Sequence, residues 1–485
     1  MSADSVLVLS RPFYIKDRDC GYCHGNKKDH YALESMVDRG IKNGSVTIGS
    51  SVEQMTCRQY DEFINQGFRR SGTFMYKNDI LRSCCRLYTI RTQLKNFKLD
   101  KKQRKIVNRF VKEIYEPTKH DNKTFDLYQI LQAQRKSKSF YTRYEPSVFS
   151  REKFQLYKKY QMAVHNDKEE DVTESAFKRF LCDTPFPSSE VDGNRHQWSD
   201  LNHWIANWSQ EKGPQTLKNR RIGPVHECWY LKDKLIAVSI MDFLPSGVSS
   251  LYFIWDPDYA HLSLGTVSGI REILMCNELN LGYYYLGYYI EDCQKMKYKA
   301  KFGGEILDLC NEVYFPLDIV KPYIANGRFF VIDEDENEGE QSDKSFEDLY
   351  QELEMENNGH PVSYEDSPFN GKPLRNIAEQ IYGVDSPTFK VLANLAQLTK
   401  SIPGMNEELD LPGVIPGVIP LWQIVEWFEN GTIDKEIPIS MFDCVQYKMV
   451  ECSFAEASSH QKRIYIDCIR LFGLDKVQEA TILID

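Results

Sequence analysis

The 485-residue sequence lacks any run of about twenty apolar residues, the length that a helix needs to cross a bilayer. Its first residues also lack the basic flank and the longer apolar stretch of a secretory signal. Thirteen cysteines, an odd number, cannot all form internal disulfides. We therefore expect a protein of the cytoplasm, and also of the nucleus, with reduced thiols and no membrane partner.

Several motifs of common enzyme classes are missing. No Walker A motif and no GxGxxG occur, so neither an ATP site nor a dinucleotide site is expected. No HExxH or EF-hand pattern is present, and Ser249 does not stand in a GxSxG motif, which argues against a hydrolase nucleophile. An excess of positive charge is absent as well, since 70 acidic residues outnumber 60 basic ones. A surface that coats nucleic acid all round is therefore excluded, although a local basic face is not.

Four cysteines near the N-terminus form the first pattern that carries chemistry. Cys20 and Cys23 lie in "DRDCGYCHG", and Cys84 and Cys85 are adjacent in "LRSCCRLYTIRT". In a reducing compartment, a CxxC turn with two further thiols indicates a zinc ion or an Fe–S cluster. His24 is a substitute ligand and His30 a weaker one. The alternative is that Cys84 and Cys85 are ordinary buried thiols.

A basic segment follows these cysteines. Between residues 86 and 112 the only acid is Asp100, and "KKQRKIVNRFVKEIYE" predicts a basic amphipathic helix. Such a face, with interleaved Tyr and Phe, is typical of contact with nucleic acid. The alternative is a solvated helix exterior. The candidate residues are Lys101, Lys102, Arg104, Lys105 and Arg109.

Residues 215–310 predict a sheet with a crossover helix. "KLIAVSIMDFLP", "GVSSLYFIWDPDY" and "YYYLGYYI" are expected strands, and "SLGTVSGIREILMCNELNLG" is an expected helix, an order typical of an α/β or α+β domain. Upstream, "SVEQMTCRQYDEFINQGF" predicts a helix that ends at Gly67. Carboxylates at the strand ends could act as bases or hold an amine, although Asp-Pro is also a common turn. Paired arginines in "GFRRSG" could bind a carboxylate or phosphate, or could form a surface turn.

Four long motifs together resemble one family. They are "CGYC", "GFRRSGTFMYKNDILRSCC", "DFLPSGVSSLYFIWDPDYAHLSLGT" and "YLGYYIEDCQKMKYKAKF", and they span residues 10–310 in order. The resemblance is to the arginyl-tRNA–protein transferases in their fungal form. It implies transfer of arginine from arginyl-tRNA to the α-amino group of proteins that begin with Asp, Glu or oxidised Cys. The product would enter the N-degron pathway, where ubiquitin-ligase machinery is the expected partner.

The resemblance also implies a fold and a site. The expected fold is α/β (α+β), with a GNAT-like acyltransferase domain, an N-terminal domain that holds zinc or an Fe–S cluster at the four cysteines, and helical additions. The basic helix would face the acceptor arm of tRNA. At the reacting centre we expect Asp256, with Tyr252 and Asp242 nearby. The expected substrate-binding residues are Arg69, Arg70, Ser249, Ser250, Tyr288, Lys295, Lys297 and Lys299. Of these, Arg69 and Arg70 would receive the acidic side chain or a tRNA phosphate, with the three lysines as competing candidates.

Four segments and two other functions complete the expectations. The segments are an N-terminal cysteine domain with its basic segment (1–135), a GNAT-like catalytic domain (136–330), an acidic, partly disordered insert (331–360) and a C-terminal extension packed on the catalytic domain (361–485). The alternatives are a non-catalytic RNA-binding adaptor and an acetyl-CoA-dependent N-acetyltransferase. "LSLGTVSG" lacks the Q/R-x-x-G-x-G/A signature of acetyl-CoA binding, which disfavours the second.

Overall fold

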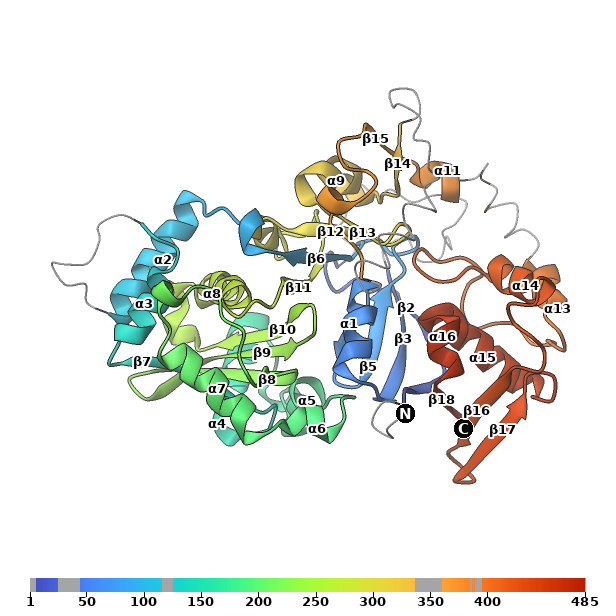
Figure 1. Ribbon diagram of the computed structural model, residues 1–485, viewed down its shortest axis with the longest axis horizontal. Coiled ribbons are helices and arrows are strands. Elements are labelled where there is room, and N and C mark those ends of the chain that lie inside the picture. The colour runs from blue at the N-terminus through green and yellow to red at the C-terminus, as the bar shows by residue number, and fades with distance from the viewer. Residues whose placement is uncertain are drawn as a thin grey trace.

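Two large mixed sheets organise the molecule, and the expected α/β fold class is confirmed (Figure 1). The computed structural model describes residues 6–24, 44–115, 125–335, 360–383 and 395–484, with Ser386 and Thr388. His30 and most of the acidic insert, residues 336–359, lie outside the described residues. No helix within the described ranges is long and apolar enough to cross a membrane.

The first sheet joins both ends of the chain. Its strands run in the order β17 (Lys448–Ser453), β16 (Pro438–Asp443), β18 (Thr481–Ile484), β1 (Val8–Ser10), β3 (Ser45–Gln54), β5 (Phe74–Asn78) and β4 (Arg69–Ser71), and β2 (Phe13–Asp17) also pairs with β3. Strands β1 and β18 lie side by side in parallel, near the N and C labels of Figure 1. The helices that belong to this half are α1 (Cys57–Asn65), α13 (Leu395–Ser401), α14 (Leu421–Glu429), α15 (Ser459–Phe472) and α16 (Leu474–Gln478). The C-terminal extension therefore completes the first sheet.

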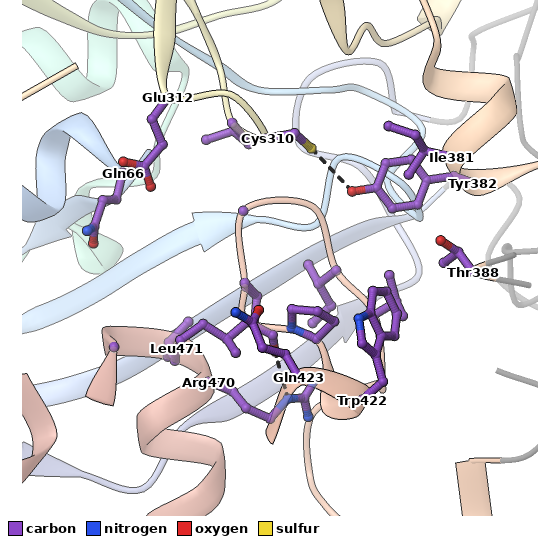
Figure 2. A pocket seen from close by; sticks show the side chains of 18 of the residues that line it. Gln66, Cys310, Glu312, Ile381, Tyr382, Thr388, Trp422, Gln423, Arg470 and Leu471 are labelled. Carbon is purple, nitrogen blue, oxygen red and sulfur yellow. Dashed lines mark hydrogen bonds between the residues drawn. The ribbon is translucent and has the colours of Figure 1, made fainter. Parts of the chain in front are cut away.

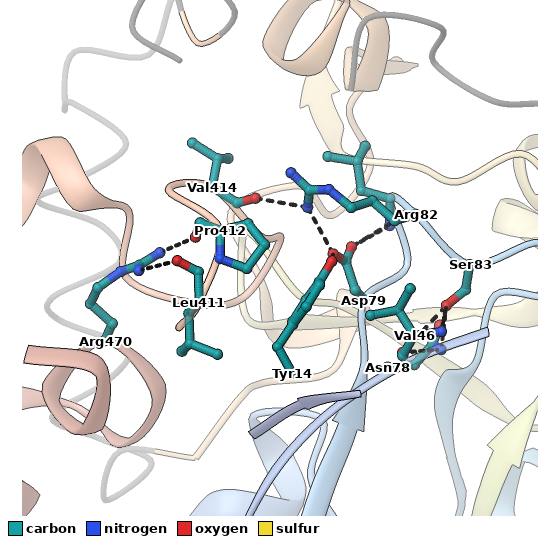
Figure 3. Close-up of polar contacts among 11 residues, drawn as sticks. Tyr14, Val46, Asn78, Asp79, Arg82, Ser83, Leu411, Pro412, Val414 and Arg470 are labelled. Carbon is teal, nitrogen blue, oxygen red and sulfur yellow. Dashed lines mark hydrogen bonds and ion pairs between the residues drawn. The ribbon is translucent and has the colours of Figure 1, made fainter. Parts of the chain in front are cut away.

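Aromatic packing and a polar network hold the C-terminal extension in place. The ring of Phe472 stacks on Phe68, which follows α1, with centroids 5.5 Å apart. Figure 3 shows how the buried Asp79 carboxylate accepts from the Tyr14 hydroxyl (2.8 Å) and from Arg82 (2.7 Å), which also donates to the main-chain carbonyl of Val414 (3.0 Å). The N-terminal strands are thus fastened to the loop that precedes α14.

The second sheet runs from residue 88 to residue 316. Its order is β13 (Val313–Pro316), β12 (Glu305–Asp308), β6 (Tyr88–Thr92), β11 (Tyr283–Tyr289), β10 (Gly247–Trp255), β9 (Lys234–Phe243), β8 (Gly223–Leu231) and β7 (Phe140–Glu145). A small separate sheet pairs β14 (Ile332–Glu334) with β15 (Leu374–Asn376). Strand β6 precedes the domain boundary expected at residue 135, yet it belongs to the same sheet as the strands that follow that boundary. The division of the chain into four segments stays a prediction.

Helices cover both faces of the second sheet. They are α2 (Lys101–Ile114), α3 (Gln129–Lys136), α4 (Arg151–Tyr160), α5 (Glu174–Leu181), α6 (Ser188–Asp192), α7 (Arg195–Ala206), α8 (Leu264–Glu278), α9 (Leu317–Ile324) and α11 (Ala378–Tyr382). Side chains of a strand alternate between the two faces. Accordingly, Trp229 packs in one core with α2 and α8, whereas Cys228 and Tyr230 pack in a second core with α4 and α5.

Strands β10 and β11 separate after a short parallel pairing. They pair at Gly247–Tyr283, Val248–Tyr284 and Ser249–Tyr285, and no pairing follows although both strands continue. A bulge between Ser250 and Tyr252 exchanges the two faces of β10, and a second bulge lies on β11 around Gly287, whose φ is +76°. The two bulges therefore flank an opening between the strands, which we call the β10–β11 opening.

Candidate active site and metal centre

The four predicted cysteines come together at one point. The Sγ atoms of Cys20, Cys23, Cys84 and Cys85 all lie within 4.8 Å of one another, and three of these residues are buried. Cys23 and Cys84 are 3.6 Å apart at sulfur. A tetrahedral zinc ion, with Zn–S bonds of about 2.3 Å, holds its sulfurs about 3.8 Å apart. The four thiols therefore fit a metal ion, as expected from the CxxC and CC spacing.

The local backbone explains how the CxxC segment closes on the other two thiols. The main-chain N–H of His24 donates to the carbonyl of Cys20 (2.8 Å), so the segment forms a tight turn, and His24 itself has a φ of +48°. Its imidazole is not part of the four-sulfur group. The pKa of the Cys20 thiol lies well below its usual range because Cys84 and Cys85 donate to its sulfur. A thiolate, the form that binds metal, is thus favoured.

Two buried cations meet beside the β10–β11 opening. Arg69 of β4 donates from Nη2 to the carbonyl of Gly287 (3.1 Å), and Lys299 donates from Nζ to the carbonyl of Tyr288 (2.7 Å). The guanidinium carbon of Arg69 lies 5.2 Å from the centroid of the Tyr288 ring. Neither cation forms an ion pair with a carboxylate among the described residues, and the buried Nε of Arg69 has no partner there. Burial, followed by the charge of Arg69, lowers the pKa of Lys299 to about 7.

Arg70 has a different environment from its neighbour. It donates twice to the carboxylate of Asp242, from Nε at 2.7 Å and from Nη2 at 2.6 Å, and both side chains are buried. It also donates to the carbonyls of Gly72 and Asp183. Since Asp242 is on β9 opposite Ser249, this bidentate ion pair fixes β4 next to the start of the β10–β11 opening.

Asp256 and Asp242 are not neighbours. Asp242 pairs with Ser249, whereas the main chain of Asp256 bonds to Ile236, six residues back along β9. Because β9 and β10 are antiparallel, this separation corresponds to about 20 Å. Asp256 accepts from Lys159 (2.5 Å) and Lys234 (2.7 Å). Burial opposes ionisation, but these two lysines hold the pKa of Asp256 below its usual value.

The other predicted substrate-binding residues are scattered around the opening. Tyr252 donates from its hydroxyl to Gln161 (3.0 Å), and the Tyr288 hydroxyl donates to the carbonyl of Gly67 (2.8 Å). Ser249 is buried and Ser250 is half-buried. Among the three lysines, Lys295 and Lys297 are exposed and only Lys299 is buried.

The predicted basic helix is confirmed as α2. Asp100 caps its N-terminus in a capping box with Gln103. Its apolar residues face the core, and its basic residues lie on the exposed side: Lys101, Lys102, Arg104, Lys105 and Arg109. Arg109 donates to the hydroxyl of Ser263, immediately before α8 (3.0 Å). The basic face thus continues to the N-terminus of the helix that follows β10.

The structure also has a cavity that the sequence did not indicate. It has a volume of about 430 Å³ and lies between the β12–β13 connection, α11, the loop before α14 and the end of α15 (Figure 2). The Cys310 thiol and the Tyr382 hydroxyl are 3.2 Å apart on its wall. None of the predicted site residues lines it.

Two further residues near the site were missed from the sequence. Cys293 packs in the same buried cluster as three of the four grouped cysteines, and no spacing rule connects it with them. Glu272 is buried on α8 and accepts from three hydroxyl groups. A signal for Glu272 did exist, because it is an acid in the middle of a helix that is otherwise largely apolar.

Comparison with known proteins gives the family. Residues 18–105 match the family described as arginine-tRNA-protein transferase, N terminus, and residues 152–308 match its C-terminal counterpart. Arginyl-tRNA–protein transferase 1 of Saccharomyces cerevisiae is 41% identical over 96% of this chain and 95% of its own length. Arginyl-tRNA–protein transferase 2 of Arabidopsis thaliana is 40% identical over 38% of this chain and 29% of its own. An aspartate/glutamate leucyltransferase of Campylobacter jejuni is 41% identical over 18% of this chain and 36% of its own. The resemblance found in the motifs is therefore confirmed, and the chain belongs to the arginyl-tRNA–protein transferases, a family of aminoacyltransferases.

Proposed function

We propose that this enzyme transfers arginine from arginyl-tRNA to the α-amino group of proteins that begin with Asp, Glu or oxidised Cys. The observation that carries the choice of acceptor is the pair of buried cations, Arg69 and Lys299, which lack a carboxylate partner among the described residues. A buried charge without a partner is unfavourable unless a ligand supplies one. A carboxylate or a sulfinate on the first residue of the acceptor is such a ligand.

The reaction needs little beyond positioning. The neutral α-amino nitrogen attacks the ester carbonyl carbon, a C–N bond forms, the C–O bond to the ribose breaks, and the amine proton is lost while the ribose oxygen gains one. The α-amino pKa near 8 makes the neutral amine accessible. Beyond Ser249, the edge of β10 that faces β11 has no strand partner among the described residues, so its main-chain N–H groups are candidate donors for the oxyanion. The ester would accordingly lie in the β10–β11 opening.

We propose that Arg70 and Asp242 hold β4 next to the β10–β11 opening and do not contact the substrates directly. Their mutual hydrogen bonds use the carboxylate that was expected to hold the amine. Asp256 in turn orients Lys159 and Lys234, both half-exposed, at the far end of β10. Tyr252 and Ser250 remain candidates for contact with the aminoacyl group, since both lie on the strand that borders the opening.

The tRNA would bind along α2. Lys101, Lys102, Arg104 and Lys105 lie on the exposed side of α2, whose one acid is Glu113 in the last turn, and Arg109 extends the basic side to Ser263 at the start of α8. Phosphates of the acceptor arm are the matching ligand, because such contacts are electrostatic and independent of sequence. The 3′ end would then enter the β10–β11 opening beside α8.

The four cysteines would hold a single tetrahedral zinc ion in preference to an Fe–S cluster. Four sulfurs within 4.8 Å suit ligands of one ion, whereas a cluster distributes its thiolates over several irons and separates them further. The ion would stabilise the junction between the CxxC turn and β6. As a soluble enzyme of cytoplasm and nucleus, the protein would supply its products to ubiquitin-ligase machinery.

The test compares acceptor peptides. Wild type, a Lys299→Met variant and the matched control Lys297→Met, an exposed lysine two residues away, are assayed with arginyl-tRNA and peptides that begin with Asp, Glu or Ala. Lys299→Met should lower kcat/KM for the acidic peptides by about 30-fold or more, and the control should not. Tight tRNA binding in all three proteins is expected. Equal loss for Asp- and Ala-initiated peptides would contradict the assignment.

A further inference from the structure

Glu272 is a buried carboxylate that has hydroxyl groups for neighbours and no cation. It is 1% exposed on α8. Its Oε1 accepts from the hydroxyls of Ser239 (2.6 Å) and Ser268, and its Oε2 accepts from the hydroxyl of Tyr284. Within the described ranges it forms no ion pair with Lys, Arg or His. Other buried acids of the second sheet differ in this respect: Asp242 pairs with Arg70, Glu227 with Arg271 and Glu305 with Arg91.

The hydrogen bonds of Glu272 leave room for one more donor. A carboxylate has about four acceptor positions, and three are used here. The remaining position is on Oε2, the oxygen that faces Tyr284 of β11. Burial raises the pKa of Glu272, which the three hydroxyl donors oppose. A cation that reached this oxygen would therefore find an acceptor and favour the ionised form.

Glu272 bonds to the strands on either side of β10, to Ser239 of β9 and to Tyr284 of β11. Tyr284 belongs to the short paired segment of β10 and β11, directly before the strands separate. On the other side, Gly269, one turn before Glu272, has no room for a side chain because the ring of Phe302 would lie 2.8 Å from it. The 3₁₀ helix that ends at Phe302 (Lys297–Phe302) is thus held against the face of α8 that carries Glu272.

That 3₁₀ helix also carries a solvent-accessible aromatic ring. Tyr298 is 47% exposed, and its pKa is raised to about 12 by desolvation, with further contributions from Tyr160 and Glu272. The 3₁₀ helix that packs on the Glu272 face of α8 therefore presents an aromatic side chain to solvent. Aromatic rings and a carboxylate are the partners that a guanidinium prefers.

We propose that Glu272 receives the guanidinium of the arginyl group, beside Tyr284 and Tyr298, and so selects arginine over uncharged amino acids. The inference rests on the proposed function, since it places the aminoacyl ester in the β10–β11 opening. A relative named for leucine transfer matches part of this chain, which indicates that the choice of donor amino acid is separable from the choice of acceptor.

The test uses citrulline, an uncharged analogue of arginine. The same tRNA is charged with arginine or with citrulline, which has the same length and shape but an uncharged ureido group, and the acceptor peptide begins with Asp. Wild type should prefer the arginyl substrate by about 10- to 100-fold in kcat/KM. Glu272→Gln should bring this ratio close to 1. The control Glu278→Gln changes another buried carboxylate of α8, one that bonds to Trp208, and should retain the ratio of wild type.

Two results would overturn the inference. One is a Glu272→Gln variant whose arginyl-to-citrullinyl ratio equals that of wild type. The other needs no variant, so it applies even if Glu272→Gln fails to fold: 3′-amino-3′-deoxyadenosine acylated with arginine or with citrulline is titrated into wild-type protein by calorimetry. Tenfold tighter binding of the arginyl compound is expected, and equal affinities would exclude a carboxylate contact. Neither result affects the proposed function, which fails only if wild type does not arginylate the Asp-initiated peptide.

Discussion

The most informative perturbation is a change of Lys299 to arginine. In the free enzyme the pKa of Lys299 is about 7, so much of its charge is absent at the pH where the α-amino group of the acceptor becomes neutral. Arginine keeps its charge throughout. The variant and wild type should therefore differ in the shape of their pH profiles, whatever constant factor the new side chain introduces.

The size of the effect can be calculated. With a pKa of about 7, the protonated fraction of Lys299 is about 0.76 at pH 6.5 and about 0.03 at pH 8.5. If acid recognition needs the charge, the ratio of kcat/KM between Lys299→Arg and wild type rises from about 1.3 to about 30 over this range. The ratio cancels the ionisation of the peptide amine and the alkaline hydrolysis of arginyl-tRNA, because both affect the two enzymes equally. Initial rates with an Asp-initiated peptide at subsaturating concentration give it directly.

The groups around Lys299 determine whether this reasoning holds. Burial and then the charge of Arg69 lower the pKa of Lys299, and Cys293 raises it by a smaller amount. If the ratio of kcat/KM between Lys299→Arg and wild type stayed constant from pH 6.5 to pH 8.5, the charge of Lys299 would not be the one that recognises the acidic side chain of the acceptor. The stability of the protein offers an internal check. Between pH 7 and pH 10.5 the unfolded chain binds the Lys299 proton and the folded chain does not, so the free energy of unfolding rises with pH. Lys299→Met should lose that rise, at most about 5 kcal/mol, and remain folded at neutral pH.

Three further predictions concern the rest of the site. Lys105→Glu on α2 should weaken tRNA binding and should reduce, by about 1, the slope of the logarithm of the binding constant against the logarithm of the salt concentration. An unchanged slope in filter-binding measurements would mean that the exposed side of α2 does not contact tRNA. Cys20→Ser should lower the bound metal measured by mass spectrometry, whereas Cys293→Ser should keep it, and equal metal in both would argue against the four-thiol site. Arg70→Met should destabilise the protein by about 3–5 kcal/mol in urea titrations because Asp242 is left buried and unpaired, and a joint Arg70→Met/Asp242→Leu variant should recover most of that loss.

Local patterns in the sequence predicted three of the eight strands of the second sheet, β9, β10 and β11, and two of the helices packed on it, α2 and α8. The apolar segments before and after Pro245 are β9 and β10, and the helix expected between Ser263 and Gly282 is α8. The helix predicted from residue 51 to Gly67 is shorter, because its first residues continue β3 and the helix begins only after the Thr56 cap. Hydrophobic spacing could not distinguish the two, since Val52 and Met55, which are buried here, are also three positions apart, as on one face of a helix.

Long-range geometry is what the sequence could not provide. Asp242 and Asp256 are fourteen positions apart and belong to one motif, yet the antiparallel pairing of β9 with β10 sends them to opposite ends of the two strands. Similarly, Arg69 and Arg70 are adjacent, but successive residues of a strand face opposite sides. One therefore reaches Gly287 and the other reaches Asp242. The joining of β16, β17 and β18 to the N-terminal strands depends on contacts between residues more than 350 positions apart, for which no local signal exists.

On the proposed assignments, the enzyme must keep opposite charges apart until both substrates are bound. Lys299 and Glu272 would cancel each other if they met, and an ion pair within the protein would remove the preference for an acidic acceptor and for a basic donor together. They have different partners: Lys299 donates to the carbonyl of Tyr288, whereas Glu272 accepts from Ser239, Ser268 and Tyr284. The close contact of Phe302 with Gly269 fixes the 3₁₀ helix at Lys297–Phe302 against α8. A side chain at position 269 should therefore disturb recognition of both substrates, although Gly269 contacts neither of them.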